Sequence, residues 1–302
     1  MTRVPSPRLG VLCMVGATLL WGATFVVTRD ALAAIPAVTL VLARFVTAGV
    51  LMTGVAVVLG RRFSRDTWIV GVVSGPFVAG CYALQASGLT GTSAGSSAFL
   101  TAAGTLLLAV FAWIGLGQRP GRIVVLGIAL ALLGSGLLSW RAGLQFGRAE
   151  LVTLLGAASY AVALVVVAAR IDRVDPIAVT AVQTLVAALV LIPFVPGPPD
   201  PAALFLGPNR WRFLYLALAG SVIAPLLQVT AQRALPSARI GILFALEPVF
   251  ALLFAVTVGA ERFEARWWAG AGLILFAVLL VEGRSSSSPP SGSGSSSRSA
   301  TS

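Results

Sequence analysis

The chain has 302 residues, of which 58% are hydrophobic and only 10% are charged, and its mean hydropathy is +0.96. A water-soluble domain of this size would not carry so apolar a surface, so the composition predicts an integral membrane protein. All 21 basic residues are arginine and the net charge is +11. Because no nucleic-acid-binding motif accompanies this charge, we expect no nucleic-acid partner.

Ten windows are long and apolar enough to cross the hydrocarbon core of a bilayer, which needs about 20 residues in a helix. Lipid offers the backbone no hydrogen-bond partners, so segments this long satisfy their own backbone as helices. We therefore predict an all-α membrane protein with ten transmembrane helices, over residues 9–28, 38–60, 68–89, 95–117, 123–140, 151–169, 176–196, 213–231, 240–259 and 267–282. The Ser/Gly/Pro-rich tail at 285–302 cannot bury a core and is predicted to be disordered.

The arginines are distributed unevenly over the predicted loops. With residues 1–8 placed in the cytoplasm, the cytoplasmic segments hold thirteen arginines and the outer loops hold seven, while Arg44 lies inside a predicted span. An excess of basic residues on the cytoplasmic side is typical of membrane proteins. We therefore predict a multi-pass protein of the cell (plasma or inner) membrane with both termini in the cytoplasm.

The two halves of the chain share a weak pattern. At an offset of 139 residues, WGA at 21–23 lies over YAV at 160–162, and LARFVTA at 42–48 lies over AVQTLVA at 181–187. At an offset of 146, YALQASGLTGTSAG at 82–95 lies over QVTAQRALPSARIG at 228–241. Each half, 9–140 and 149–282, has five predicted spans, so the second enters the membrane from the opposite side. This predicts two inverted five-helix repeats with a substrate site between them near the midplane, an architecture typical of secondary transporters.

Several segments resemble the EamA-type transporters of the drug/metabolite transporter superfamily. They are LLWGATF at 19–25, TSAGSSAFLTA at 92–102, LGQRP at 116–120 and, most specifically, LPSARIGILFALEPVFALLFAVTVGAERF at 235–263. The resemblance covers residues 9–282 and implies two five-helix halves around a cavity walled mainly by the first four helices of each. Many such proteins export amino acids, metabolites or drugs. Gln118 departs from the pattern, since glutamate is common there, but it lies in a predicted loop.

Glu247 is the only acidic residue that falls deep within a predicted span. It is expected near the midplane, where a charge costs roughly 2.5 to 3.5 kcal/mol on insertion scales, so the carboxyl must be neutral, paired or facing a wet cavity. We favour a cavity role in proton coupling; the alternative is a protonated carboxyl that bridges helices. The neighbouring Pro248 has no N–H for the carbonyl of Phe244, which predicts a kink in the helix.

Other polar and aromatic residues within the spans are candidates for the lining of a substrate cavity. Arg44 could snorkel outward, pair with Glu247 or bind a substrate carboxylate. Gln183, its partner in the repeat, keeps a polar group at the equivalent place. The remaining candidates are aromatic or amide side chains, although each such residue is more often a packing or interfacial one: Trp21, Phe25, Tyr82, Gln85, Tyr160, Gln228, Gln232 and Phe244.

The sequence offers little for catalysis. It has no histidine, its cysteines Cys13 and Cys81 fall inside predicted spans as packing residues, and it has no ATP-binding or calcium-binding motif. We therefore expect no enzyme activity, metal or cofactor. The expected function is secondary active export of a small metabolite, amino acid or drug by alternating access, with protons as the coupling ion. A facilitative carrier or importer is the nearest alternative, and a membrane scaffold or enzyme is the alternative of another class.

Overall fold

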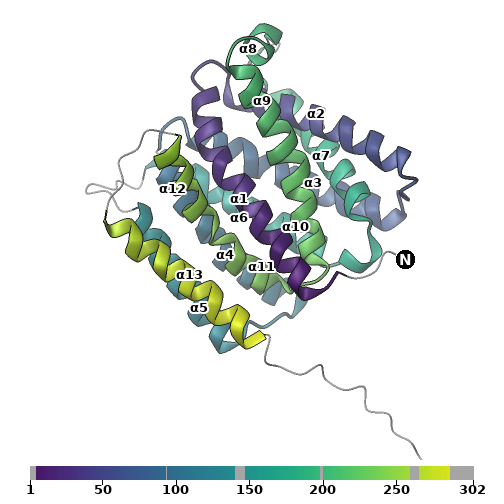
Figure 1. Ribbon diagram of the computed structural model, residues 1–302. Coiled ribbons are helices and arrows are strands. Elements are labelled where there is room, and N and C mark those ends of the chain that lie inside the picture. The colour runs from purple at the N-terminus through teal and green to yellow at the C-terminus, as the bar shows by residue number, and fades with distance from the viewer. Residues whose placement is uncertain (1–4, 93, 140–146, 198–199, 259–264, 286–302) are drawn as a thin grey trace, which may run out of the picture.

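The computed structural model describes residues 5–92, 94–139, 147–197, 200–258 and 265–285. Within these ranges every regular element is a helix (Figure 1). The first half of the chain forms α1 (Pro7–Ala31), α2 (Ala37–Val58), α3 (Arg65–Gly88), α4 (Ala94–Leu116) and α5 (Arg122–Ser139). The second half forms α6 (Arg148–Ala168), α7 (Pro176–Leu191), α8 (Pro201–Phe205), α9 (Asn209–Leu218), α10 (Ala224–Gln232), α11 (Ser237–Phe244), α12 (Glu247–Thr257) and α13 (Arg266–Ser285). The prediction of an all-α protein is confirmed.

The lengths of the helices agree with a membrane protein. Eight helical segments in the described residues are long and apolar enough to cross a bilayer: α1 to α4, α6, Pro176–Phe194, Asn209–Gln232 and Ser237–Thr257. Two apolar stretches are shorter, Arg122–Leu137 in α5 and Trp267–Gly283 in α13. A straight crossing needs about 20 residues, so the full count of ten transmembrane helices stays a prediction. The tail predicted to be disordered lies outside the described residues, apart from Ser285 at the end of α13.

Several helices begin at residues suited to capping. The side chains of Ser6, Ser64 and Asp175 each accept a hydrogen bond from a backbone N–H in the first turn of α1, α3 and α7. Proline follows the cap in α1 and α7, where its missing N–H would have had no helical partner. The sequence therefore encodes these helix starts locally.

Replacing Asp175 with alanine is expected to lower the free energy of unfolding by about 1 kcal/mol. Asp175 Oδ1 accepts from the backbone N–H groups of Ile177 and Ala178 at 3.0 and 3.2 Å, and Oδ2 lies 3.5 Å from Nη1 of Arg61. Asp175→Asn keeps the cap and removes only the partly exposed ion pair, so it should lower the free energy of unfolding by less than Asp175→Ala does. Unfolding of the detergent-solubilised variants measures both, and equal losses would assign the effect to the ion pair.

The two halves of the chain interlock rather than standing apart. Helix α1 packs against α10 and α12 of the second half, while α3 and α4 pack against α6. Helix α2 packs against α7, and α5 packs against α13. Figure 1 shows α5 and α13 together at one side of the bundle and α2, α3 and α7 at the other. The largest cluster of buried apolar residues in the described part of the chain joins α5 and α13 to α1, α4, α6 and α11, and it includes Met14, Leu108, Leu164, Ile240 and Ile274.

Gly22 permits a close approach of α1 to α12. A Cβ atom at this position would lie 2.6 Å from Cβ of Phe250 and 2.8 Å from the backbone nitrogen of Ala251. Neither atom is the end of a flexible side chain, so only glycine fits without movement of a helix. This approach brings Trp21, the neighbour of Gly22, close to the centre of the bundle, where it is 4% exposed.

Candidate functional site

The segment predicted as the ninth span is divided into two helices near its middle. Helix α11 ends at Phe244 and α12 begins at Glu247. Between them, the N–H groups of Ala245 and Leu246 donate to carbonyls three residues back, at 3.0 and 3.1 Å, as in a 3₁₀ turn. Pro248 is the second residue of α12, where the absence of an N–H is tolerated. The division places the Glu247 carboxyl at a helix N-terminus inside the bundle, where the helix dipole favours negative charge.

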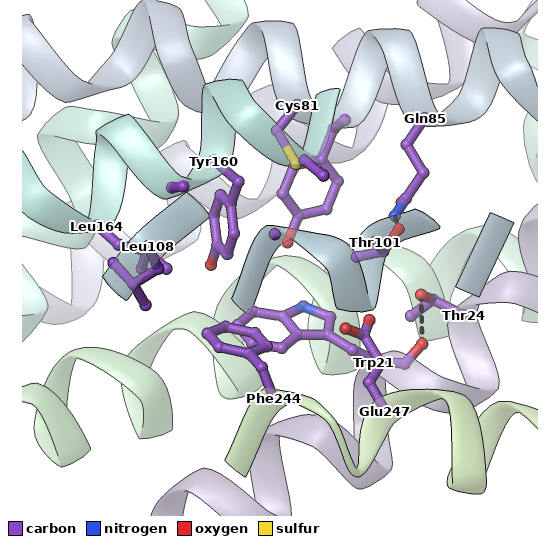
Figure 2. A pocket seen from close by; sticks show the side chains of 14 residues that line it. Trp21, Thr24, Cys81, Gln85, Thr101, Leu108, Tyr160, Leu164, Phe244 and Glu247 are labelled. Carbon is purple, nitrogen blue, oxygen red and sulfur yellow. Dashed lines mark hydrogen bonds between the residues drawn. The ribbon is translucent and has the colours of Figure 1, made fainter. Parts of the chain in front are cut away.

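A cavity lies beside Glu247, between the two halves of the chain (Figure 2). Helices α1, α3 and α4 of the first half and α6, α11 and α12 of the second form its walls. Six of the residues singled out from the sequence line it: Trp21, Tyr82, Gln85, Tyr160, Phe244 and Glu247. The other described lining residues are Thr24, Cys81, Thr101, Gly104, Leu108, Ala157, Ala161 and Leu164.

Four aromatic rings of this lining contact one another. The rings of Trp21 and Phe244 are stacked, with centroids 5.4 Å apart and an interplanar angle of 13°. Tyr160 meets both rings edge-on, at 6.0 Å from Trp21 and 5.9 Å from Phe244. Tyr82 in turn lies 6.3 Å from Tyr160. Stacked and edge-to-face pairs are the arrangements that aromatic rings prefer, and their faces carry partial negative charge.

The Glu247 carboxyl has no described partner. Its residue is 6% exposed, and no hydrogen bond or ion pair joins it to any of the residues that the structure describes. None of the described residues that line the cavity is basic. A buried carboxyl in such surroundings is stable when it is protonated or when a cation lies beside it.

Arg44 lies behind the cavity wall and does not pair with Glu247. It is 3% exposed, its Nε donates to Oγ of Ser221 at 2.9 Å, and its guanidinium lies 4.9 Å from the ring centroid of Tyr82. Two further candidates are buried away from the described lining. Gln183 is on α7, and Phe25 packs with Leu89, Ala94, Ala98 and Ala251.

Gln228 and Gln232 also lie behind the lining, in a chain of hydrogen bonds between α6 and α10. The hydroxyl of Tyr160 donates to Oε1 of Gln228 at 3.4 Å, and Gln228 Nε2 donates to Oε1 of Gln232. Gln232 Nε2 completes the chain by donating to the carbonyl of Leu164 at 3.0 Å. These two amides therefore hold Tyr160 in place.

Sequence reasoning missed part of the lining. Thr101 accepts a hydrogen bond from Nε2 of Gln85 at 3.1 Å and donates to the carbonyl of Ser97 at 2.9 Å. Cys81, expected only to pack, lines the cavity. Thr24 and Thr101 were missed because small polar residues give no distinct signal in a sequence, since they are common wherever membrane helices pack.

The comparisons with known proteins agree with this architecture. The model of the EamA-like transporter family matches residues 8–140 and again residues 147–283. A protein of Archaeoglobus fulgidus named "Uncharacterized transporter" is 26% identical over 266 residues, which cover 87% of this chain and 82% of that protein. A solved structure titled only "Crystal structure of protein" superposes with a TM-score of 0.72 at 22% identity, over 92% of this chain and 99% of that one, and shows the shared fold. Because the family model matches both halves and most of the chain, the protein belongs to the EamA-like transporter family of membrane transporters.

Proposed function

We propose that the protein is a secondary transporter that exports a small organic cation in exchange for protons. The observation that carries this proposal is the Glu247 carboxyl, which faces a cavity walled by four aromatic rings and has no described cationic partner. Aromatic faces and a carboxylate together attract an ammonium group through cation–π and ionic contacts. An anionic substrate would meet no basic side chain in the described lining, so amines and cationic drugs fit better than organic acids. Export as the direction follows the family resemblance.

Exchange follows from competition for one carboxyl. When Glu247 is ionised, a cation in the cavity balances its charge; when Glu247 is protonated, that attraction is lost and the cation leaves. Proton and substrate therefore bind in turn. One half of the transport cycle carries the substrate across the membrane, and the other half carries the proton. The N-terminus of α12 favours the ionised state and the apolar rings favour the protonated one, so both states are accessible at this position.

Alternating access requires two related halves, and the packing supports inverted repeats. In the register of the repeat, α3 corresponds to α10 and α6 corresponds to α1, and the structure packs α3 on α6 and α10 on α1. Trp21 and Tyr160, which match at the offset of 139 residues, meet edge-on at the cavity. Matched residues that meet in this way are expected beside a two-fold axis between the halves.

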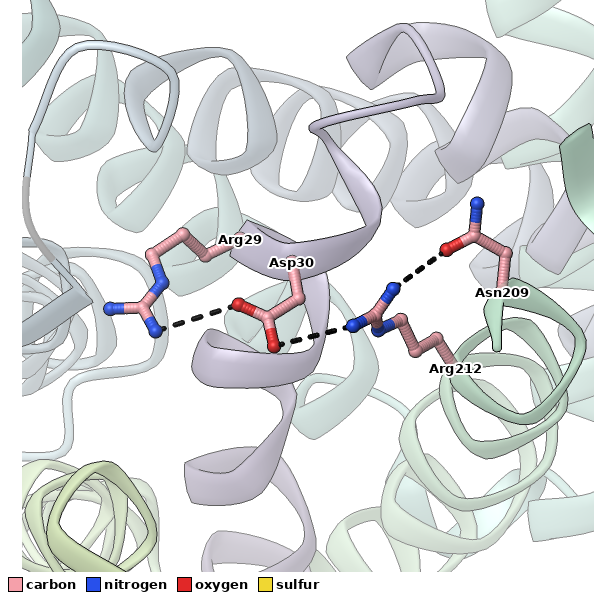
Figure 3. A network of polar contacts seen from close by, with 4 residues as sticks. All are labelled: Arg29, Asp30, Asn209 and Arg212. Atoms are coloured by element: carbon pink, nitrogen blue, oxygen red, sulfur yellow. Dashed lines mark hydrogen bonds and ion pairs between the residues drawn. The ribbon is translucent and has the colours of Figure 1, made fainter. Parts of the chain in front are cut away.

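Ion pairs at both ends of the bundle supply contacts that open and close. Near the end of α1, Asp30 lies 3.5 Å from Arg29 and 3.8 Å from Arg212 of α9 (Figure 3). At the opposite end of the bundle, Asp66 in the first turn of α3 lies 3.5 Å from Arg170. Partly exposed pairs of this kind contribute only about 0–1 kcal/mol each, so breaking them costs little. We assign the end of Asp66 and Arg170 to the cytoplasm because arginines are concentrated there.

Mass-spectrometric profiling of culture medium tests the proposed function. Cells that express the wild type or carry an empty vector are compared at matched growth, and protein levels are checked. Compounds enriched outside the wild-type cells are expected to carry a positive charge at neutral pH. Enrichment of organic acids alone would refute the assignment of substrate class, and depletion of a cation from the medium would indicate import.

A further inference from the structure

The connection between α9 and α10 leaves one backbone carbonyl without a helical donor. It is a π-helical turn over Ala219–Ile223, in which the N–H of Ala224 donates to the carbonyl of Ala219 instead of that of Gly220. In the π-helical register the next N–H would come from residue 225, which is proline and has none. The helix therefore provides no donor for the Gly220 carbonyl.

Two side chains of the cavity bond to this free carbonyl. Nε1 of Trp21 donates to it at 3.0 Å, and the hydroxyl of Tyr82 donates to it at 3.4 Å. Trp21 belongs to α1 and Tyr82 to α3, so one oxygen of a third helical segment holds both walls. A buried carbonyl without a hydrogen-bond donor costs free energy. Both donors are therefore kept in position, because moving either away would leave the carbonyl less well satisfied.

The absence of a side chain at residue 220 allows this approach. A Cβ atom there would lie 2.9 Å from Nη2 of Arg44 and 3.0 Å from Cγ2 of Thr24. Arg44 is in turn fixed by Ser221, the next residue of the π-helical turn, and lies over the ring of Tyr82. The turn thus contacts Tyr82 directly through a carbonyl and indirectly through Arg44.

We propose that Pro225 is a positioning residue for the cavity. By withholding an N–H, it reserves the Gly220 carbonyl as the shared acceptor that sets the positions of Trp21 and Tyr82. Neither Pro225 nor Gly220 is among the lining residues, so Pro225 acts through the two aromatic side chains. Its consequence for transport, a change in which cations are accepted, rests on the proposed function.

The indole N–H resonance of Trp21 tests the proposal without a substrate. In protein labelled with ¹⁵N at tryptophan, the Trp21 resonance is identified by its loss in Trp21→Phe. Pro225→Ala supplies an N–H for the Gly220 carbonyl, so the Trp21 indole proton is expected to move upfield and to exchange faster with solvent. Pro201→Ala is a matched control, because Pro201 also lies in the first turn of its helix, and it should leave the resonance in place. A resonance that stays in place in folded Pro225→Ala would overturn the proposal.

A second variant tests the shared acceptor without any change in α10. Tyr82→Phe removes the competing donor and keeps the ring. Because Trp21 then has the carbonyl to itself, its hydrogen bond should shorten and its indole proton should move downfield, opposite to the shift in Pro225→Ala. An unchanged or upfield-shifted resonance would show that the two side chains do not share the oxygen. This result stays informative if Pro225→Ala does not fold.

The ratio of the two most enriched compounds in the medium-profiling experiment tests the consequence for transport. Pro225→Ala is expected to change this ratio, whereas Pro201→Ala is expected to preserve it. Resonance shifts with an unchanged ratio would overturn the role in selectivity and keep the role in positioning. If the wild type enriches nothing, the proposed function fails, while the resonance measurements still decide whether Pro225 positions Trp21 and Tyr82.

Discussion

Glu247→Gln is expected to reduce proton-driven export by at least about tenfold, which corresponds to about 1.4 kcal/mol. Glutamine has nearly the same size and keeps the packing of the buried site. Its neutral amide, however, neither takes up and releases a proton as a carboxyl does nor balances the charge of a cation. The measurement is uptake of the exported compound into inside-out vesicles with an imposed pH gradient. Wild-type transport should increase with the gradient, and transport by Glu247→Gln should not respond to it.

Glu150→Gln is the matched control for this experiment. Glu150 lies in the first turn of α6, where its Oε2 accepts from the backbone N–H of Gly147 at 3.0 Å. Glutamine also offers an oxygen for this cap, so export should be unchanged. If Glu247→Gln were as active as Glu150→Gln at every pH gradient, Glu247 would have a structural role and a facilitative carrier would be the better description.

Gly22→Ala is expected to lower the free energy of unfolding by about 1–3 kcal/mol. The added methyl group would lie within 3 Å of Cβ of Phe250 and of the backbone nitrogen of Ala251, so α1 and α12 must separate. The separation moves Trp21 away from Glu247, and export is expected to fall as well. Thermal unfolding of the solubilised protein and the vesicle assay measure the two effects.

Gly54→Ala gives the opposite expectation at another helical glycine. Gly54 lies inside α2, is exposed, and has no atom within 4 Å of a Cβ built on it. Alanine restricts the unfolded chain more than glycine does, so this variant should gain about 0.5–1 kcal/mol. If Gly22→Ala raised the stability as much as Gly54→Ala, helix propensity, and not the contact between α1 and α12, would determine the effect at Gly22.

The helices could be predicted from the sequence because lipid imposes a length and a composition on each span. Each of the ten predicted windows corresponds to a helix or to a pair of helices in the structure. The π-helical turn at Ala219–Ile223 could not be predicted, because a local change of register leaves the hydropathy unaltered. The short helix α8 lies in a segment predicted as a loop, and its five residues are too few to give a periodic signal.

The candidate site could be predicted in part. Glu247 was found because a carboxyl inside an apolar run is costly unless it faces a cavity or a partner. The same reasoning applied to Arg44 and Gln183 indicates only that they face the protein interior. Which interior surface they face depends on the packing of α2 against α7, which a single sequence does not specify. Repeat register gave better information, since it relates Trp21 to Tyr160, and the rings of these two residues meet at the cavity.

Because Trp21 stacks on Phe244 beside Glu247, its fluorescence is expected to report on the contents of the cavity. Indole fluorescence responds to nearby charge and to a neighbouring ring, and Trp21 is the one tryptophan among the described lining residues. A chain in which the other six of the seven tryptophans are replaced by phenylalanine would emit from the cavity alone. Titration of such a protein with candidate amines would follow occupancy of the cavity directly, without radiolabels or vesicles, and would turn the search for a substrate into a spectroscopic screen.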